Sequence, residues 1–322
     1  MKTLAILACI IVACVVVVQW RATARETATA RDFGPQGRLL NVDGVTVHAE
    51  IMGDGPDVIL IHGAGGNTRD FTFSLAPQLA KRYRVIVFDR PGLGWTERAP
   101  GPYGGAWNRR AESPVVQAEL LQKAAAQLGA QKPIIVGQSF GGAVAYAWAL
   151  TDPEIGGVVS LAGVANPWPG DLNWMYPVNA SPLGGALFVP LLTAFAPATL
   201  VDATVASIFT PDPAPEGYLD HVGAGLTLRR ASMRANARQV NSLRPHIVEM
   251  SARYGDIKVP VEIVHGDADT IVPLDIHSEK VPSQIEGARL TVLKGAGHMP
   301  HHSHPEEVIA AIDRVADRAG LR

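Results

Sequence analysis

Cysteine and charge are both scarce in this chain of 322 residues. Cys9 and Cys14 are its only cysteines, and both lie in an N-terminal apolar run. The remainder therefore contains no disulfide, thiol nucleophile or cysteine-ligated metal. Charged residues make up 18% of the chain and the formal net charge is −2. No basic surface is available to hold nucleic acid and no acidic tail to attract a cationic partner.

The chain begins with an unbroken apolar run from Leu4 to Val18. A membrane-spanning helix needs about 20 apolar residues, whereas the apolar region of a cleaved signal has about 7 to 15. We favour a single uncleaved membrane anchor in residues 1–24, with its orientation left open. A periplasmic or secreted protein is the alternative, because the Ala-Thr-Ala triplets that begin at Ala22 and Ala28 resemble signal cleavage sites.

The rest of the chain alternates between strand and helix patterns. Residues 39–51 predict a β-hairpin closed by an Asp-Gly turn. Short β-branched runs follow at 58–61, 85–88, 134–136, 158–161, 261–264 and 290–293. Helical patterns cover 73–82, 113–128, 140–150 and 305–319. Buried strands separated by helices predict an α/β fold, with a mostly parallel doubly wound sheet, an antiparallel N-terminal hairpin and helices on both faces.

A long segment rich in proline and glycine interrupts this alternation. It contains helical patterns at 183–196, 199–209, 218–229 and 231–253. We interpret residues 166–257 as a mostly helical cap. The cap is inserted into a core formed by residues 34–165 and 258–322.

Ser139 lies in the motif GQSFG, between a strand pattern and a helix pattern. This context is typical of a nucleophile elbow, a sharp turn that holds a serine on strained backbone and needs glycines where a Cβ would collide. A GxSxG motif is common by chance, but one that follows a strand and begins a helix is much rarer. We predict that Ser139 is a catalytic nucleophile.

A serine hydroxyl needs an imidazole to accept its proton, and the imidazole needs a carboxylate to fix its tautomer. The loop after the strand pattern at 261–264 offers Asp267 and Asp269 as the acid. His298 follows the next strand pattern and is the predicted base. The chain order serine, acid, histidine is that of a doubly wound hydrolase sheet.

The loop HGAGG, at residues 62–66, follows an early buried strand and allows close approach of a substrate. An oxyanion hole needs amides that face the oxygen which becomes negative in the tetrahedral intermediate. We expect these from Ala64 and from Phe140, the residue after the nucleophile. A phosphate-cradling turn is the less favoured interpretation, because the loop lacks the lysine and hydroxyl pair of a P-loop.

With these motifs, and with FDRPGLGW at residues 88–95, the chain resembles the α/β hydrolase superfamily. The resemblance is to the cap-bearing group of serine esterases, cofactor-free haloperoxidase-like enzymes and carbon–carbon bond hydrolases, and it covers roughly residue 39 to the C-terminus. It implies that the acid is Asp269, with Asp267 in reserve. Relatives often carry histidine at the position of Gln138. Relatives that cleave epoxides or carbon–halogen bonds carry aspartate in place of Ser139, so those reactions are disfavoured.

Several other residues have simpler interpretations. Asp89 and Arg90 are expected to pin a loop, and His62 and His265 to be structural. The histidines around His298 resemble a metal site only superficially, because flanking prolines suggest a loop that leads into a helix, so no metal is expected. Apolar residues that can line a substrate pocket, or equally fill the core of the cap, are Trp168, Trp174, Tyr176, Phe188, Phe195 and Met299.

The sequence therefore predicts a serine hydrolase that acts without a cofactor on a small apolar ester. An amide or thioester is the second choice of substrate. Two alternatives remain open. One is hydrolysis of a carbon–carbon bond in a diketone-like substrate by the same triad. The other is a membrane-tethered binding module that keeps the fold but performs no chemistry.

Overall fold

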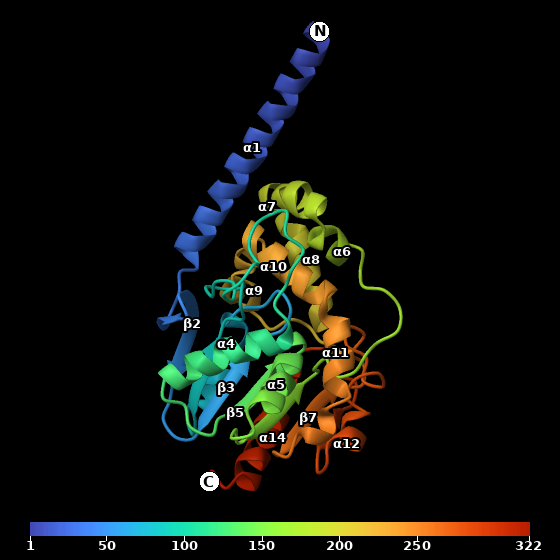
Figure 1. The fold of residues 1–322 in the computed structure, drawn as a ribbon. Coiled ribbons are helices and arrows are strands. Elements are labelled where there is room, and N and C mark those ends of the chain that lie inside the picture. The colour runs from blue at the N-terminus through green and yellow to red at the C-terminus, as the bar shows by residue number, and fades with distance from the viewer.

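The β-branched runs form the strands of one sheet in the computed structural model, which describes residues 1–322 (Figure 1). The strand order across the sheet is β1-β2-β4-β3-β5-β6-β7-β8. The strands are β1 (Arg38–Val42), β2 (Val45–Met52), β3 (Asp57–Ile61), β4 (Arg84–Phe88), β5 (Ile134–Gln138), β6 (Gly157–Leu161), β7 (Val261–Gly266) and β8 (Arg289–Leu293). The strand that leads to Ser139, β5, lies in the interior of the sheet.

The first two strands form the predicted hairpin, and β2 also pairs antiparallel with β4. Its turn residues Asp43 and Gly44 have φ values of 52° and 84°, the left-handed conformation that a two-residue hairpin turn of this type requires. All other neighbouring strands are parallel. The predicted fold class is confirmed.

Helices cover both faces of the sheet, because successive residues of each central strand point to opposite sides. Ile59 and Ile135 belong to the core that packs under α4 and α5. Leu60 and Val136 belong to the core under α3 and α14. The helices after β3 that lie outside the cap, which are divided between the two faces and the loops at the strand ends, are α2 (Arg69–Thr72), α3 (Leu75–Leu79), α4 (Pro114–Gln127), α5 (Phe140–Thr151), α12 (Val281–Gln284), α13 (Pro300–Ser303) and α14 (Pro305–Arg318).

A run of helices lies between β6 and β7, where the sequence predicted an inserted cap, and it stands beside α1 at one end of the sheet (Figure 1). These elements are α6 (Met175–Ala180), the π-helix η1 (Gly184–Phe188), α7 (Val189–Phe195), α8 (Ala198–Phe209), α9 (Tyr218–Val222), α10 (Arg230–Asn241) and α11 (Leu243–Ser251). Short 3₁₀ turns lie at Ala224–Leu226 (η2) and Tyr254–Asp256 (η3). The structure adds α6, which the sequence did not predict, and divides the single helix expected over 231–253 at Ser242.

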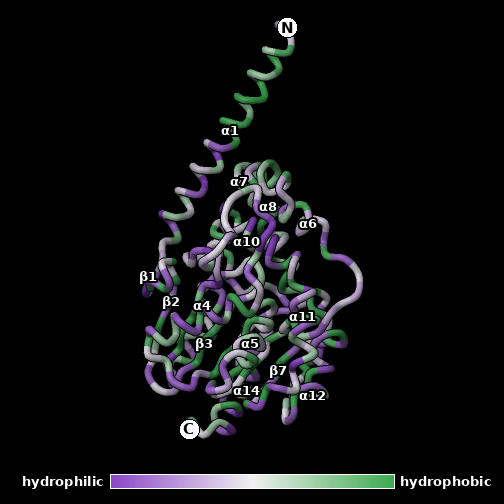
Figure 2. Tube along the Cα trace, viewed as in Figure 1, coloured by the Kyte–Doolittle hydropathy of each residue, from purple (hydrophilic) through white to green (hydrophobic).

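Helix α1 (Lys2–Asp32) is long and apolar enough to cross a membrane. Its N-terminal part is apolar and projects from the body, whereas its C-terminal part carries polar residues (Figures 1 and 2). That part packs on the cap: the Nε of Arg21 donates a hydrogen bond to the carbonyl of Ala194 at 2.9 Å, and Glu26 pairs with Arg230 at 2.7 Å. The helix therefore continues beyond the predicted segment 1–24 and becomes part of the folded body.

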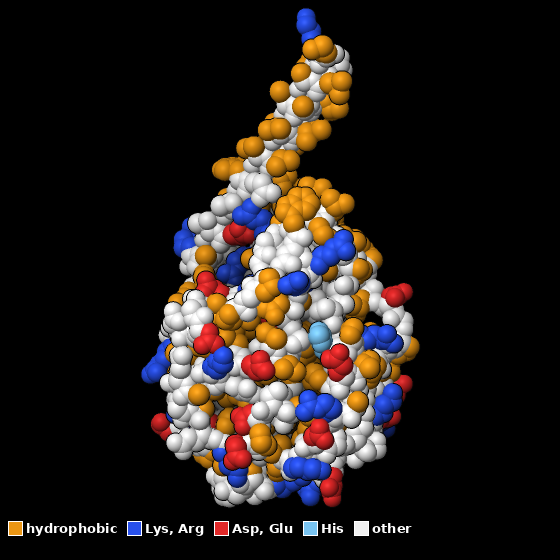
Figure 3. Space-filling model, viewed as in Figure 1, with side chains coloured by type: hydrophobic (Ala, Val, Ile, Leu, Met, Phe, Trp, Pro, Cys, Tyr) orange, Lys and Arg blue, Asp and Glu red, His pale blue; other side chains and the backbone are white.

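Exposed apolar side chains gather near the same end of the molecule, over η1 and α7 beside α1 (Figure 3). They include Leu183, Leu187, Leu191 and Phe195. The apolar part of α1 and this surface of the cap thus lie near each other.

Candidate active site

Ser139 occupies the sharp turn between β5 and α5, with φ 52° and ψ −118°. Such a conformation is uncommon for a residue with a Cβ and costs on the order of 1–3 kcal/mol. The turn is held from both sides, because the Ser139 amide donates to the carbonyl of Leu161 at 2.9 Å and its carbonyl accepts from the amide of Val164 at 3.0 Å. The side chain makes no capping hydrogen bond to α5, so its hydroxyl is not used to stabilise the helix.

The glycines of the motif are needed because backbone passes very close to them. A Cβ at Gly137 would lie 2.1 Å from the carbonyl oxygen of Gly141, and a Cβ at Gly141 would lie 2.1 Å from that of Ile61. No Cβ is found at such distances from backbone atoms. The strand, the turn and the helix therefore fit together only with glycine at these two positions.

His298 and Asp269 meet at the ends of neighbouring strands. Asp269 follows β7, His298 follows β8, and Nδ1 of the imidazole lies 2.7 Å from Oδ2 of the carboxylate. The other carboxylate oxygen accepts the amides of Ile271 and Val272 at 2.8 and 3.0 Å. The structure thus places Asp269 on His298, whereas Asp267 is exposed and accepts the amide of Gly295 at 2.6 Å.

Asp269 is held in its ionised form. Burial alone would raise its pKa, but hydrogen bonds from His265 and His298 outweigh burial, and the pKa lies below that of an ordinary aspartate. The Nε2 of His265 lies 3.1 Å from Oδ2, so this histidine steadies the same oxygen that His298 contacts. His265, expected to be structural, therefore directly contacts the acid of the predicted triad.

Gln138 joins the serine turn to the histidine loop. Its Nε2 donates to the carbonyl of His298 at 3.2 Å and lies 3.6 Å from the sulfur of Met299. The side chain beside the nucleophile thus fixes the backbone that carries the predicted base. Ser139 and His298 form no hydrogen bond to each other, and in free enzymes such bonds are often long and tighten only with substrate.

The predicted oxyanion loop lies against the serine turn. A Cβ at Gly63 would lie 3.0 Å from the Cβ of Ser139, so the loop passes directly beside the nucleophile. The amide of Phe140 belongs to the first turn of α5, where helix amides have no partner within the helix. The structure therefore brings the loop with Ala64, the helix start with Phe140 and the serine turn to one place.

Two groups that the sequence analysis did not identify fix this loop from the cap. The side-chain oxygen of Asn236, on α10, accepts the amide of Gly65 at 2.7 Å. The hydroxyl of Thr227 donates to the carbonyl of Gly65. The cap is thereby hydrogen-bonded to the loop that is expected to hold the oxyanion.

From the core side, Arg90 supports the same loop. Its guanidinium donates to the carbonyls of His62 and Gly63, each at 2.9 Å, and lies over the ring of Phe140. Asp89 accepts the amides of Thr68 and Trp95, each at 2.7 Å. Their expected role in pinning a loop therefore agrees with their contacts.

The apolar substrate candidates occupy different surroundings. Met299 contacts Gln138 beside the serine turn. Trp168 and Tyr176 pack on the main core, and Trp174 stacks near Phe188 with ring centroids 6.0 Å apart. Phe195 is half-exposed and lies under the guanidinium of Arg21 on α1. A role for any of them in binding substrate stays a prediction.

The structure gathers two of the four neighbouring histidines around a carboxylate. The Nε2 atoms of His301 and His302 lie 3.1 and 2.9 Å from the carboxylate oxygens of Asp70, which also accepts the hydroxyl of Tyr218 at 2.8 Å. Ligand atoms of these two histidines and Asp70 lie within 4.8 Å of one another, so the three residues can hold a metal ion. Burial lowers the pKa of His301 to about 4, which keeps the imidazole neutral and able to donate to Asp70. The contacts join α2, α9 and α13 around the histidine loop.

Comparison with known proteins places these features in context. The family model of the alpha/beta hydrolase fold matches residues 56–305. A 2-hydroxy-6-oxononadienedioate/2-hydroxy-6-oxononatrienedioate hydrolase from Paraburkholderia xenovorans is 28% identical over 278 residues, which cover 84% of this chain and 90% of the relative. A pimeloyl acyl-carrier protein methyl ester esterase from Edwardsiella ictaluri is 27% identical, over 81% of this chain and 93% of the relative.

Among solved structures, a bacterial membrane phospholipase A is similar in fold, with a TM-score of 0.64 and 20% identity. The superposition covers 100% of this chain and 99% of the other. The likeness in fold therefore extends over α1 as well as over the sheet and its helices.

Proposed function

Because the chain belongs to the alpha/beta hydrolase family, we propose that it is a serine hydrolase that cleaves a carboxylic ester through an acyl-enzyme. The observation that carries this proposal is the arrangement at the ends of β5, β7 and β8. A strained serine with an uncommitted hydroxyl ends one strand, and a histidine paired with a buried carboxylate at 2.7 Å follows the others.

The pairing of His298 with Asp269 defines the role of each ring nitrogen. Nδ1 carries the proton that is donated to Asp269, so Nε2 has the free lone pair and acts as general base for Ser139. Since the lowered pKa of Asp269 keeps it ionised at neutral pH, the carboxylate stabilises the imidazolium that forms when the serine proton is transferred.

The bond changes follow from these roles. Ser139 Oγ attacks the ester carbonyl, and the tetrahedral oxyanion is held by the amides of Ala64 and Phe140, each worth about 3 kcal/mol in the transition state. The imidazolium of His298 then protonates the leaving alcohol as the carbon–oxygen bond breaks. In the second half, water loses a proton to His298 and attacks the acyl carbonyl; His298 then returns that proton to Ser139 Oγ as the bond between this oxygen and the acyl carbon breaks, which releases the acid and the free serine.

Hydrolysis of a carbon–carbon bond is the second candidate. It is favoured by the Paraburkholderia relative, which is named as a hydrolase of a 2-hydroxy-6-oxo dienedioate. The Edwardsiella relative, named as a methyl ester esterase, favours the ester at nearly the same identity. We place the ester first because a chain with a helix apolar enough to cross a membrane and with exposed apolar side chains on its cap suits a substrate with an apolar acyl or alcohol portion.

We also infer that α1 is an uncleaved membrane anchor and that the ester can be part of a lipid. Cleavage after Ala24 would remove Arg21 and its hydrogen bond to Ala194. Cleavage after Ala30 would also remove Glu26, the ion-pair partner of Arg230. The similar fold of a membrane phospholipase A over the whole chain supports the same inference. N-terminal sequencing of the mature protein checks it: a start at Met1 or Lys2 agrees, and a start after Ala24 or Ala30 contradicts it.

The catalytic proposal is tested by turnover of short-chain aryl esters and of vinylogous diketones, measured in parallel on the full chain. Ester turnover is expected, and Ser139→Ala should lower kcat/KM by roughly 10⁴-fold or more, because members of a triad act as a unit. His298→Ala should give a similar loss. Full ester turnover by folded Ser139→Ala would refute the proposal, and turnover of the diketone alone would favour the second candidate.

A further inference from the structure

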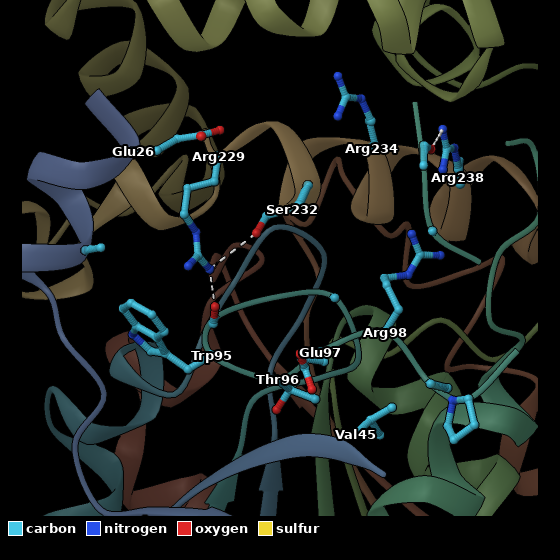
Figure 4. A pocket seen from close by; sticks show the side chains of 18 of the residues that line it. Glu26, Val45, Trp95, Thr96, Glu97, Arg98, Arg229, Ser232, Arg234 and Arg238 are labelled. Atoms are coloured by element: carbon cyan, nitrogen blue, oxygen red, sulfur yellow. Dashed lines mark hydrogen bonds between the residues drawn. The ribbon is translucent and has the colours of Figure 1, made fainter. Parts of the chain in front are cut away.

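A cavity of about 900 Å³ lies between α1, the loop after β4 and α10. Thr23, Glu26 and Thr27 of α1 form one wall. Arg229, just before α10, and Arg234 and Arg238 of α10 form another (Figure 4). None of Ser139, Asp269, His298, Ala64 and Phe140 lines it. Its volume is within the range of about 300–1,000 Å³ that is usual for sites of small organic ligands.

The charges that line the cavity are mostly positive. Four arginines and only two glutamates line the cavity. They are Arg98, Arg229, Arg234, Arg238, Glu26 and Glu97. Glu26 is already paired with Arg230, which is outside the cavity lining, and Glu97 accepts the amide of Thr46 at 2.6 Å. Arg98 has its own partner, since it makes two hydrogen bonds of 2.6 Å to the buried carboxylate of Glu112.

Arg229, which directly precedes α10, and Arg234 and Arg238 of α10 form no ion pair with any carboxylate. Arg234 donates through Nε to the carbonyl of Gly185 at 2.7 Å, and Arg229 lies over the ring of Trp95. Arg238 donates through Nη2 to two backbone carbonyls, but its buried Nε has no hydrogen-bond partner. The guanidinium groups of Arg234 and Arg238 thus reach this space with donors left over and without an ion-pair partner of their own.

The arginines also repel one another. Burial, together with the nearby charges of Arg98 and Arg234, lowers the pKa of Arg238 to about 10. The guanidinium groups of Arg98, Arg234 and Arg238 lie on the same side of the cavity (Figure 4). An anion between them would relieve this repulsion and supply the missing acceptors.

We propose that this cavity binds a phosphate-bearing anion, with Arg234 and Arg238 as its main ligands. A phosphate group offers several acceptor oxygens in a tetrahedral arrangement and can accept from two or three guanidinium forks at once, whereas a carboxylate has two oxygens in one plane. The site is separate from the proposed triad and does not depend on the hydrolase activity.

The position of the cavity suggests where the phosphate comes from. From Val18, the end of the apolar run, to Thr23 the rise of a helix is about 7.5 Å. The headgroup layer on each side of a bilayer is about 5–8 Å thick, from a hydrocarbon core of about 30 Å and a total of about 40–45 Å. If α1 spans a membrane, the cavity therefore opens at the level of the lipid phosphates. A lipid headgroup and a free phosphate ester share the required chemistry.

The test measures binding by the full chain in uncharged detergent micelles. Inorganic phosphate and glycerol 3-phosphate are titrated by calorimetry, and the protein is then moved to nanodiscs of phosphatidylcholine with or without phosphatidylglycerol. Arg234→Gln should weaken phosphate binding by roughly tenfold or more, since it removes a charge-assisted donor pair. Arg234→Lys keeps the charge but loses the planar pair of donors. Its affinity for phosphate should lie between that of the unmodified chain and that of Arg234→Gln.

Arg244→Gln is the matched control, because Arg244 also donates one Nε hydrogen bond to a backbone carbonyl, that of Trp168, but does not line the cavity. It should bind phosphate like the unmodified chain. Ser139→Ala should also bind normally, which separates this proposal from the catalytic one. Compared with the protein in uncharged micelles, loss of affinity for added phosphate in either kind of nanodisc would identify the lipid headgroup as the source, because both lipids carry a phosphate, and unchanged affinity in both would identify a soluble phosphate ester. Absence of phosphate binding, or equal binding by folded Arg234→Gln, would overturn the proposal.

Discussion

Ser139 combines two properties that seldom occur together, a strained backbone and a side chain with no structural use. Its φ of 52° is imposed by the packing of β5 and α5, and its hydroxyl does not cap the helix. A serine that merely filled a turn would gain stability from a relaxed backbone or from a capping bond. The cost of the strain is explained if the hydroxyl must stand at the entrance of a reaction site.

Among single residues, the prediction that is tested most readily is the choice of Asp269 rather than Asp267 as the acid. Asp269→Asn should lower kcat/KM for an ester by about 10⁴-fold, because the amide no longer selects the imidazole tautomer with a free Nε2. Asp267→Asn is the control, since this exposed residue contacts only the amide of Gly295 and should change activity by less than about threefold. Steady-state kinetics on both variants decides between them, and a larger loss in Asp267→Asn would reverse the assignment.

The positions of Ser139 at a strand-to-helix turn and of His298 on the loop after a late strand were predictable from the sequence, because a local motif and the order along the chain agreed. Residues that act through distant contacts were not. Asp70 meets His302 across 232 positions of sequence, and Asn236 meets Gly65 across 171. Nothing local to an isolated aspartate or asparagine signals such a partner, because folding alone creates the contact.

At the scale of elements, the connection between α10 and the oxyanion loop links the cap to the chemistry. The amide of Gly65 is fixed by Asn236 at 2.7 Å, one residue from the amide of Ala64 that is proposed to hold the oxyanion. A cap that moved away would release this hydrogen bond and loosen the loop. The cap is therefore expected to influence the rate of reaction as well as the choice of substrate.

Asn236→Ala tests this link. Loss of one hydrogen bond of about 1 kcal/mol that positions the loop should lower kcat by roughly fivefold with a smaller change in KM. Asn241→Ala, on the same helix but at an exposed position, is the matched control and should leave both constants unchanged. Equal kcat values for the two variants would show that α10 does not position the oxyanion loop.

The strands were predicted well because short β-branched runs of three or four residues with turn residues nearby have few other structures available. The cap helices were predicted less well. Residues 231–253 were expected as one helix, yet the chain turns at Ser242 and forms α10 and α11. Their packing against different neighbours, α6 for α10 and α5 for α11, overrides the continuous helical pattern.

At the scale of the whole molecule, buried neutral histidines join segments that are separated in the sequence. His62 donates through Nδ1 to the carbonyl of Gly63 and accepts the amide of Arg90 through Nε2 at 3.0 Å. His277 accepts the amide of Asn166 through Nδ1 at 3.2 Å. Burial lowers the pKa of each of these imidazoles to about 4, with the charges of Arg90 and His265 adding to the effect.

These two histidines predict how stability changes with pH. Their unfolded pKa is about 6.5, so between that value and about 4 the unfolded chain binds more protons than the folded one. The free energy of unfolding should therefore be fully present above pH 6.5 and fall as the pH is lowered toward 4. Urea denaturation of the detergent-solubilised chain at pH 7.5, 6 and 5 measures this. His277→Gln, which keeps a side-chain acceptor but does not titrate, should flatten the decline, and an unchanged slope would contradict the account.

The whole-molecule features that the sequence could not reveal are those built from several distant segments. The arginine-lined cavity combines α1, the loop after β4 and α10, and Arg238 lies 133 positions from the carbonyl of Gly105 that it contacts. The sequence has a formal net charge of only −2, which conceals a local excess of positive charge. The net charge of the chain therefore gave no indication of this site.

The central claim is that Ser139 is an activated nucleophile in a relay with His298 and Asp269. The most direct measurement is the mapping, by mass spectrometry of proteolytic peptides, of the adduct formed when the full chain reacts with a fluorophosphonate probe. The account predicts one phosphonylated residue, Ser139, with labelling at least roughly 10³-fold slower in His298→Ala. An unlabelled Ser139 in folded protein, or labelling of the same speed without the imidazole, would contradict it.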